Sequence, residues 1–260
     1  MTAVLQQSRA NLPAHSAPSS SSYRAQFARE GFLVVDSFAE RGELEEIRAL
    51  LDPLFARFAS ISRKQALDLA APNGVAPRIP DINHARRLEP LLNRTAVFGK
   101  ARALARQILG PPVFCVFDHA IYKPPRNSAS TPWHQDQAYA GFPHPLTAVH
   151  LWIPLQPATK ENGCMWFVPK KHHDGVLPHE RVEGTTATLQ VQSFDESHAV
   201  CCPVPCGGAT VHSPLTLHMT GANCTSEPRK AWIIHFARFG LLGQVHPRNL
   251  AYRLSRSIGR

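Results

Sequence analysis

Hydrophobic residues recur at helical spacing through the first half of the chain, and this pattern ends at residues 110–112. From 43 to 58, apolar side chains return every three or four positions, which predicts an amphipathic helix. Pro53 lies inside it and is expected to kink or split the helix. A second apolar series predicts a helix over 91–109, which Gly110 and two prolines end.

Beyond residue 112, short segments rich in Val, Ile, Phe, Trp and Thr alternate with turns marked by Pro and Gly. Seven of them predict strands: 113–122, 148–155, 165–168, 188–191, 199–204, 209–212 and 231–239. No helical pattern separates these segments, which favours antiparallel sheets over a parallel one. The expected fold class is mainly β, a double-stranded β-helix (jelly roll) with a helical N-terminal layer.

The number of domains is predicted from the segments that lack a helix or strand pattern. Residues 1–22 are rich in Ser, Ala and Gln, contain two prolines and no acid, and are predicted to be a disordered lead-in. Residues 23–30 have helical spacing and residues 32–35 form a short apolar strand. Residues 70–81 carry three prolines and a glycine and are expected to be a loop. No linker follows, so residues 23–260 are predicted to form a single domain.

Composition and charge narrow the class of protein. The 260 residues are 43% hydrophobic and 18% charged, which is typical of a globular protein, and 28 Lys and Arg against 19 Asp and Glu give a net charge of +9. This excess raises nucleic acids, membranes and small anions as partners. The basic residues form no run of five and do not alternate with aromatic residues, which argues against nucleic-acid binding.

Location and cysteine chemistry follow from similar arguments. No apolar run approaches the roughly 18 residues that cross a bilayer, and the N-terminus lacks the apolar centre of a secretion signal. We therefore expect a cytoplasmic protein that binds no membrane, with an organellar transit peptide as the weaker alternative because residues 1–22 carry serines, Arg9 and no acid. The six cysteines contain no Cys-x-x-Cys pair and are predicted to be free thiols.

Candidate metal ligands come from two segments about eighty residues apart. In an extended chain, residues i and i+2 point to one side, so His134 and Asp136 can present a nitrogen and an oxygen to one point. His212 and His218 are the candidates for a third ligand. Two histidines and one carboxylate form the ligand set of non-haem Fe(II) oxygenases, and zinc hydrolases can use the same set.

Arg229 favours the Fe(II) oxygenase over the zinc hydrolase. It follows His218 by eleven residues and opens the last predicted strand. An arginine inside a sandwich is costly unless an anion meets it, and its guanidinium fork matches a carboxylate such as the far end of 2-oxoglutarate. The alternative is a surface arginine at the start of a strand.

These features together resemble the phytanoyl-CoA dioxygenase family of Fe(II)/2-oxoglutarate oxygenases. The resemblance covers residues 122–239, and residues 27–35 are similar to the family's N-terminal strand. It is carried by His134-Gln135-Asp136, by residues 152–155, 161–165 and 168–172, and by His218, Asn223 and Arg229. The family more often has Gly-Ser-His where residues 170–172 are Lys-Lys-His, which is a local departure.

The resemblance implies roles for seven residues. Its iron ligands are His134, Asp136 and His218, and its co-substrate site contains Arg229, Thr220, Trp152 and His119. Arg229 binds the distal carboxylate of 2-oxoglutarate, and the hydroxyl of Thr220 assists it. His212 comes too early for the motif and is expected to be an ordinary strand residue.

The sequence offers only candidate residues for contact with the substrate and does not identify the substrate. Arg78, Lys123 and Arg126 are expected to flank the mouth of the site, where they could meet a carboxylate, a phosphate or a carrier-bound substrate. Tyr139 and Phe142 could supply an apolar wall. We therefore expect a small-molecule substrate, with anionic and carrier-bound compounds among the candidates.

The resemblance implies oxidation of an unactivated C–H bond by O2, with decarboxylation of 2-oxoglutarate to succinate and CO2. Relatives that halogenate have a small residue at the carboxylate position, so Asp136 argues against halogenation. Hydroxylation is the first expectation, and desaturation or cyclisation in a secondary-metabolite pathway is the alternative. A non-catalytic or zinc-binding jelly roll is less favoured.

Overall fold

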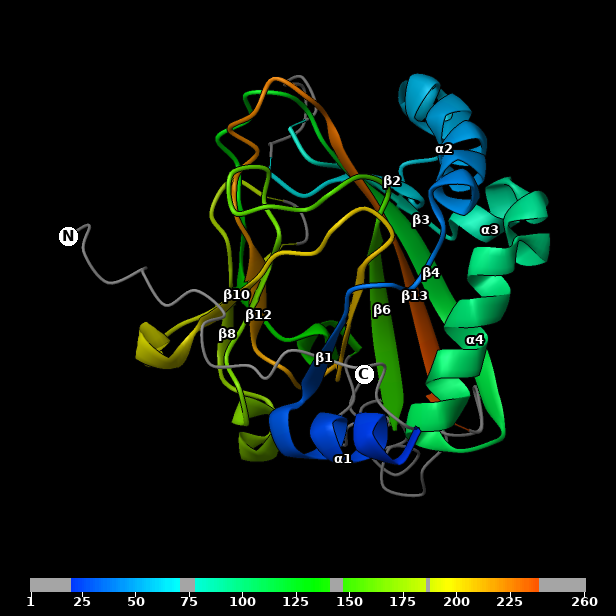
Figure 1. The fold of residues 1–260 in the computed structure, drawn as a ribbon. Coiled ribbons are helices and arrows are strands. Elements are labelled where there is room, and N and C mark those ends of the chain that lie inside the picture. Colours follow the sequence, from blue (N-terminus) through cyan, green and yellow to red (C-terminus); the bar gives the residue numbers. More distant parts are fainter. Residues whose placement is uncertain (1–19, 71–77, 141–146, 186–187, 239–260) are drawn as a thin grey trace, which may run out of the picture.

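The computed structural model describes residues 20–70, 78–140, 147–185 and 188–238. Two antiparallel sheets face each other, and helices cover the outer face of the larger one. The helices are α1 (Ser20–Glu30), α2 (Arg41–Ala56), α3 (Ala85–Leu88) and α4 (Ala96–Leu109), with short 3-10 turns at Phe58–Ser60, Pro90–Arg94, Asp136–Ala140, Lys171–Asp174 and Glu196–His198. Figure 1 shows α2, α3 and α4 together on one side of the large sheet, with β10 and β12 on the other.

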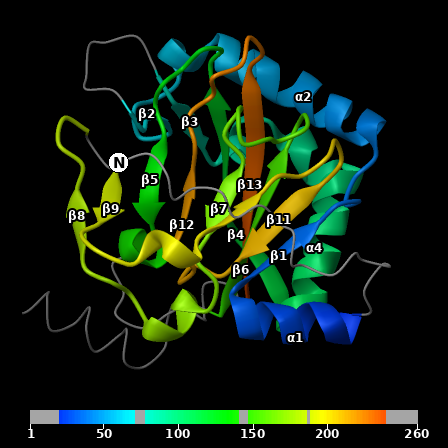
Figure 2. The ribbon, with the colours of Figure 1, turned by 60° about the vertical axis from the view of Figure 1, so that its left-hand side comes forward.

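The large sheet has seven strands in the order β1-β11-β6-β13-β4-β3-β2. Their bounds are β1 (Phe32–Val35), β11 (Ala209–His212), β6 (Ala148–Pro154), β13 (Arg229–Arg238), β4 (Val113–Lys123), β3 (Pro80–Asn83) and β2 (Ala66–Asp68). The facing sheet has the order β10-β7-β12-β5, with β10 (Val200–Cys202), β7 (Met165–Phe167), β12 (His218–Thr220) and β5 (Thr131–His134). Figure 2 shows β5, β12 and β7 side by side. A separate hairpin joins β8 (His179–Arg181) to β9 (Leu189–Val191).

The two faces of the large sheet bury different side chains. Along β6, Val149, Leu151 and Ile153 belong to the apolar cluster beneath the helices, whereas Trp152 belongs to the cluster between the sheets. This alternation follows from the two-residue period of a strand. A β-strand that is buried on both faces can therefore place functional side chains on the inner face while its outer face holds the core together.

The predicted fold class is confirmed: antiparallel sheets form a double-stranded β-helix with a helical layer. All seven predicted strands are present, and the helix at 23–30 and the strand at 32–35 lie in α1 and β1. Short strands β2, β5, β8 and β12 add to them. Residues 1–19 lie outside the described residues, so the lead-in at 1–22 stays a prediction, as does the single domain.

Two helix predictions need correction. Pro53 does not split α2, because it lies in the last turn, where its missing N–H leaves only the Ala49 carbonyl without a helical donor. The predicted helix at 91–109 is divided at Thr95, whose backbone is extended and whose hydroxyl accepts a hydrogen bond from the Phe98 amide. A 3-10 turn precedes this cap, and α4 follows it.

The predicted loop at 70–81 also needs correction at its end. Residues 71–77 lie outside the described part, but Pro80–Asn83 is strand β3, which pairs with β2 on one side and β4 on the other. Pro80 is tolerated because it is the first residue of the strand, where its missing N–H removes no interior ladder bond. This strand carries Asp81 and Asn83 into the space between the sheets.

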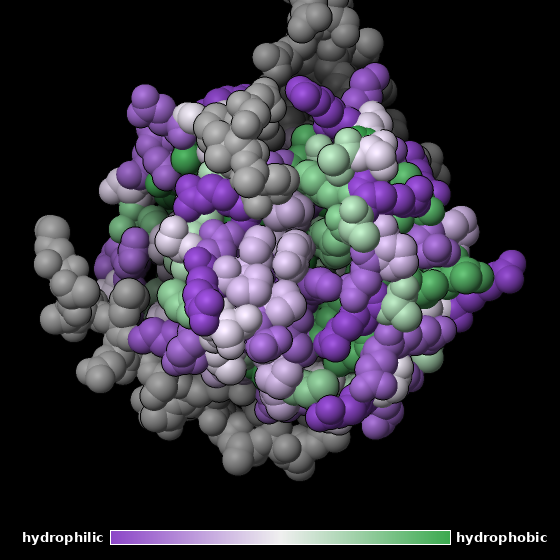
Figure 3. Space-filling view, turned by 90° about the horizontal axis from the view of Figure 1, so that it is seen from above, coloured by the Kyte–Doolittle hydropathy of each residue, from purple (hydrophilic) through white to green (hydrophobic). Residues whose placement is uncertain are grey.

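Hydrophilic side chains are spread over the face seen in Figure 3, with smaller hydrophobic areas between them. In the described segments, no helix has the length and hydrophobicity that a membrane span requires. All six cysteines are free thiols, as predicted.

Candidate functional site

A cavity of about 490 Å³ between the two sheets is lined by many polar side chains. Its walls include His134, Asp136 and His218 from the predicted metal set, and Arg229, Thr220, Trp152 and His119 from the predicted co-substrate set. Residues from β2, β3, β4 and β13 complete it. The fold thus brings together seven residues that are spread over more than a hundred positions of the chain.

The three candidate metal ligands converge on one point. His134 ends β5 and His218 begins β12, and the two residues are direct partners across these strands. Asp136 begins the 3-10 turn after β5. Their donor atoms all lie within 4.8 Å of one another, and Asp136 Oδ1 is 3.4 Å from His134 Nε2 and 3.7 Å from His218 Nε2.

The backbone sets the orientation of both imidazoles. His134 Nδ1 lies 2.8 Å from the Pro132 carbonyl, and His218 Nδ1 lies 2.8 Å from the Thr216 carbonyl. Because a carbonyl only accepts, each Nδ1 carries the hydrogen and each Nε2 is left with a lone pair. Burial, followed by the neighbouring His134, holds the pKa of His218 well below its usual range, which favours the neutral ligand form. Two neutral nitrogens and one carboxylate oxygen suit a divalent ion such as Fe(II).

The other oxygen of Asp136 is held by two further histidines. His150 Nδ1 lies 2.6 Å from Oδ2 and His212 Nε2 lies 3.1 Å from it. Burial raises the pKa of Asp136, but His218 and the hydrogen bonds of the surrounding imidazoles outweigh it and hold this pKa well below its usual range. One carboxylate oxygen therefore faces the candidate ligands while the other is fixed.

His212, the competing candidate for third ligand, lies in β11, as expected of a strand residue. Its direct partner across β11 and β6 is His150, so the two histidines approach Asp136 from neighbouring strands. A second set of possible donors, Asp136, His150 and His235, also lies within 4.8 Å. It shares the Asp136 carboxylate and therefore is not an independent metal site.

Arg229 is buried without a partner of its own. It is 1% exposed, and Nε, Nη1 and Nη2 have no hydrogen-bond partner among the described residues. Its guanidinium lies 5.4 Å from the centre of the Trp152 ring. Burial lowers the pKa of Arg229 to about 10, which leaves it charged at neutral pH. Three buried donors without an acceptor call for an anion, and the distal carboxylate of 2-oxoglutarate fits them.

Lys123 lies beside Arg229 and not at the mouth of the cavity. The two residues are partners across β4 and β13, and Lys123 is fully buried. Its ammonium donates to Thr220 Oγ1 at 2.9 Å, to the Thr220 carbonyl at 3.2 Å and to the Gly221 carbonyl. Burial, and then the charge of Arg229, hold the pKa of Lys123 well below its usual range. The expectation that it flanks the entrance is therefore corrected, because strand alternation turns it inward.

The other predicted substrate residues are scattered. Arg78 is exposed and donates to Ser128 Oγ at 3.2 Å. Arg126 is exposed, with a left-handed backbone (φ 52°), and like Arg78 it does not line the described cavity. Tyr139 does line the cavity, and its hydroxyl accepts a hydrogen bond from the Leu189 amide at 2.8 Å. Phe142 lies outside the described residues.

Beside the predicted His119, the cavity contains residues that the sequence did not identify. His119 Nδ1 lies 2.8 Å from Asp81 Oδ1, and Asp81, Asn83 and His235 all line the cavity. Burial lowers the pKa of His119, but its ion pair with Asp81 outweighs this and raises it. Alternation along 113–122 could have pointed Phe117 inward beside the predicted His119. Asp81 carried no such signal, because its strand was predicted to be a loop.

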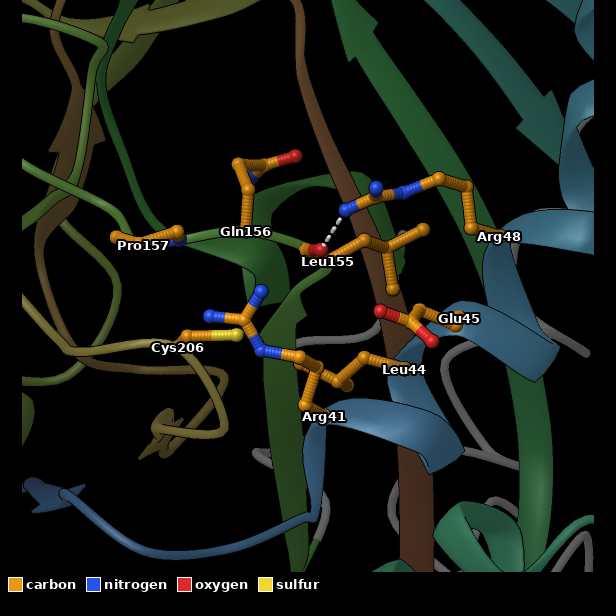
Figure 4. Close-up of a pocket in the computed structure, with 8 residues that line it drawn as sticks. All are labelled: Arg41, Leu44, Glu45, Arg48, Leu155, Gln156, Pro157 and Cys206. Carbon is orange, nitrogen blue, oxygen red and sulfur yellow. Dashed lines mark hydrogen bonds between the residues drawn. The ribbon is translucent and has the colours of Figure 1, made fainter.

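A second pocket, of about 220 Å³, lies against α2. Figure 4 shows its lining: Arg41, Leu44, Glu45, Arg48, Leu155, Gln156, Pro157 and Cys206. Arg48 reaches across it and donates to the Leu155 carbonyl at the end of β6. Among the described residues, the groups that could hold a metal ion all lie in the cavity between the sheets and not in this pocket.

Comparisons with known proteins agree with this geometry. A family model described as "Phytanoyl-CoA dioxygenase (PhyH)" matches residues 27–231. The chain is 26% identical over 256 residues to phytanoyl-CoA dioxygenase domain-containing protein 1 of Bos taurus, covering 80% of this chain and 87% of that protein.

Two solved structures are also similar. EvdO2 from Micromonospora carbonacea var. aurantiaca, in complex with 2-oxoglutarate, has a TM-score of 0.70 and 30% identity over 83% of this chain and 89% of that one. EctD from S. alaskensis, with 2-oxoglutarate and 5-hydroxyectoine, has a TM-score of 0.66 and 20% identity over 90% of this chain and 80% of that one. Because EctD is only 20% identical to this chain, its similarity shows a shared fold and nothing more.

Proposed function

The chain belongs to the phytanoyl-CoA dioxygenase family of Fe- and 2-oxoglutarate-dependent oxygenases, and on that premise we propose that it hydroxylates an unactivated C–H bond of a small organic substrate. The observation that carries the proposal is the pairing of two features in one cavity. One is a convergent His134, Asp136 and His218, and the other is a buried Arg229 without a partner among the described residues.

In this proposal, His134 Nε2, His218 Nε2 and Asp136 Oδ1 hold the iron. When bound, Fe(II) supplies the activation of O2 that is coupled to decarboxylation of 2-oxoglutarate to succinate and CO2. The Pro132 and Thr216 carbonyls keep both Nε2 atoms free of hydrogen, so the ligands need no rearrangement to bind the metal. The three protein ligands leave other coordination positions open to co-substrate and oxygen.

Arg229 and Thr220 hold the keto acid, and Lys123 adds its charge behind Thr220. The Arg229 fork meets the distal carboxylate, and Trp152 lies against the guanidinium. Lys123 has only hydrogens to donate, so Thr220 Oγ1 accepts from it and keeps its own hydrogen for another acceptor. No carboxylate of the described residues acts on the pKa of Lys123 or of Arg229, and this favours a dianionic ligand. The hydroxyl of Thr220 would add a directed hydrogen bond to it.

Hydroxylation is proposed over halogenation because Asp136 occupies the carboxylate position. Its Oδ1 faces both histidines, so the protein itself fills the place that a halide would need. A zinc hydrolase could use the same three ligands, but it would give no purpose to Arg229. Desaturation and cyclisation begin with the same chemistry and differ in what the substrate does afterwards.

The test is spectroscopic and uses the full chain. Anaerobic addition of Fe(II) and 2-oxoglutarate should give the weak visible charge-transfer band of a keto acid bound to iron, and oxygen should then yield succinate. His134→Ala should abolish the band. Arg229→Met should weaken 2-oxoglutarate binding on the order of 100-fold, because a buried charge pair is lost.

The matched control is His173→Ala, since His173 is exposed and lies outside the cavity. This variant should give the wild-type band. Absence of the band in the wild type, or a band unchanged in His134→Ala, would refute the proposed function. Incorporation of halide into product would refute the assignment of hydroxylation.

A further inference from the structure

Asn223 lies outside the cavity, and its side chain joins the end of β4 to the segment that leads into β13. It is fully buried and is not part of the cavity lining. Its Nδ2 donates to the Glu227 carbonyl at 2.8 Å, to the Pro124 carbonyl at 3.1 Å and to the Lys123 carbonyl at 3.2 Å. We call these three hydrogen bonds the Asn223 clasp.

The clasp uses both ends of the Asn223 carboxamide. Its Oδ1 lies 2.7 Å from Thr225 Oγ1 and accepts from the Thr225 amide at 3.2 Å. The three carbonyls can only accept and the backbone amide can only donate, so these neighbours fix the orientation of the carboxamide. The backbone of Asn223 adds an antiparallel bridge to Asn127, with N···O distances of 2.8 and 3.0 Å. Neither a carboxylate nor a hydroxyl could supply two hydrogens and an acceptor from this position.

The position of Arg229 depends on its backbone. Within the part of the chain that the structure describes, its three guanidinium nitrogens have no hydrogen-bond partner. The face of Trp152 lies near the guanidinium, 5.4 Å from the ring centre, but a ring face gives little direction. The place where Arg229 leaves the sheet therefore decides where its donors point.

A short and stiff connection links the clasp to Arg229. Glu227, whose carbonyl accepts from Asn223, precedes Arg229 by two residues. Pro228 lies between them, and its ring fixes its own φ and restricts Glu227 to extended backbone. On the other strand, Lys123 is the direct partner of Arg229, and its carbonyl also accepts from Asn223. The clasp therefore fixes the backbone on both sides of the pair of cations.

One stretch of chain carries a proposed metal ligand at one end and Arg229 at the other. His218 begins β12, and Asn223 lies about midway between His218 and Arg229 in the sequence. In the proposed function, the keto end of 2-oxoglutarate lies at the metal and its distal carboxylate at Arg229. A ligand bound at both ends must match the distance between them, so a small displacement of Arg229 would lose its charge-assisted hydrogen bonds.

We propose that Asn223 is a positioning residue, which holds Arg229 where it meets the distal carboxylate of a five-carbon 2-oxo diacid. Asn223 acts through the backbone of Arg229 and not by contact with the ligand. The inference rests on the proposed function, because Arg229 needs a defined position only if it binds 2-oxoglutarate. It gives Asn223 a physical role in the motif that it shares with His218 and Arg229.

The experiment compares two keto acids of equal length, 2-oxoglutarate and 2-oxopentanoate. In the second, a methyl group replaces the distal carboxylate. The full-length protein is kept with Fe(II) in the absence of oxygen, and binding of each acid is titrated through the charge-transfer band. We expect Asn223→Ala to bind 2-oxoglutarate about tenfold more weakly and 2-oxopentanoate less than about threefold more weakly, because only the first acid uses Arg229.

The ratio of the two affinities separates positioning from structural support, since a loosened cavity would weaken both acids alike. Thr225→Val is a second variant, which removes the hydroxyl beside Asn223 Oδ1 and keeps the three carbonyl acceptors. It should lower the preference for 2-oxoglutarate about threefold. Thr225→Ser keeps the hydroxyl and should retain the wild-type preference.

Asn93→Ala is the matched control. Asn93 also donates to a backbone carbonyl, that of Pro90 at 3.0 Å, and it lies in the turn Pro90–Arg94 outside the cavity. This variant should keep the wild-type affinity for both acids.

Two outcomes overturn the inference: a wild-type preference in both Asn223→Ala and Thr225→Val, or equal weakening of the two acids by Asn223→Ala. If Asn223→Ala does not fold, Thr225→Val and Thr225→Ser decide by the same ratio. A wild type that forms no band with 2-oxoglutarate, or that binds both acids equally, instead refutes the proposed role of Arg229 and the inference with it. That failure is seen in the wild type, before any variant is compared.

Discussion

At the scale of single residues, the two oxygens of Asp136 have different surroundings. Oδ1 faces His134 and His218, while Oδ2 lies within hydrogen-bonding distance of His150 and His212. A carboxylate held at one oxygen cannot rotate freely, so the other oxygen stays directed at the ligand position. We infer that His150 and His212 position Asp136 without binding the metal themselves.

Replacing His150 should therefore weaken metal binding. We expect His150→Leu to lower the affinity of the metal-free protein for Co(II) or Fe(II) roughly 10- to 100-fold, as loss of an outer hydrogen-bond partner does in other metal sites. His150→Asn, whose amide can donate from nearly the same place as Nδ1, should restore most of the affinity. Metal titration followed by absorbance measures both. Equal affinities for His150→Leu, His150→Asn and wild type would show that the hydrogen bond has no positioning role.

On the proposed function, Lys123 should make keto acid binding depend on pH. Its pKa is lowered by burial and by Arg229, so it loses its proton at a lower pH than an ordinary lysine. The protonated form is the one that attracts a dianion. The affinity for 2-oxoglutarate should therefore be full below this lowered pKa and fall as pH rises through it, before Arg229 begins to titrate near 10.

The variant Lys123→Met tests this assignment. We expect its 2-oxoglutarate affinity at neutral pH to fall about tenfold and the alkaline decrease that precedes titration of Arg229 to disappear, while Co(II) binding in the absence of keto acid stays unchanged. Titration of the charge-transfer band at several pH values measures the first two. If Lys123→Met keeps the wild-type pH profile, the dependence belongs to another group.

At the scale of secondary-structure elements, α4 is defined by a cap that divides the apolar series around it. Thr95 is 5% exposed, and its hydroxyl donates to the Leu92 carbonyl and accepts from the Phe98 amide. The residues that follow pack against the outer face of the large sheet, where Phe98 stacks on Trp232. The cap thus sets where a helix begins that covers the strands carrying the site.

Removing this cap should cost stability without altering the chemistry. Thr95→Ala is expected to lower the free energy of unfolding by about 1 kcal/mol, the usual cost of losing an N-cap side chain. Thr95→Ser keeps the hydroxyl and should lose less. Urea unfolding measures the difference, and the Fe(II)–2-oxoglutarate band should be the same in all three proteins. A changed band at full loading would mean that α4 affects the cavity directly.

At the scale of the whole molecule, one sheet serves both stability and chemistry. Trp232, Ile234 and Phe236 of β13 join the core beneath the helices, while Arg229, Ile233 and His235 of the same strand line the cavity. The period of two keeps these sets apart. Two of the basic residues behind the net charge of +9, Lys123 and Arg229, are buried as direct partners across β4 and β13.

Local patterns determined much of this protein without any knowledge of its tertiary structure. Strand alternation and turn residues predicted the double-stranded β-helix, because burial on a sheet leaves a period of two in the sequence. The pair His134 and Asp136 was predictable because residues two apart in an extended chain share a face. Similarity of ordered motifs added His218 and Arg229, which spacing alone left open between alternatives.

Only the tertiary structure decided which distant residues surround that set. His150 and His212 contact Asp136 because β6 and β11 pair in one particular register, and a shift of either strand by one residue would turn its histidine to the other face. Lys123 moved from the expected entrance to the side of Arg229 for the same reason. Asp81 reached the cavity in a strand whose prolines had predicted a loop. Register and pairing depend on the sum of contacts across the whole sheet, so no short stretch of sequence records them.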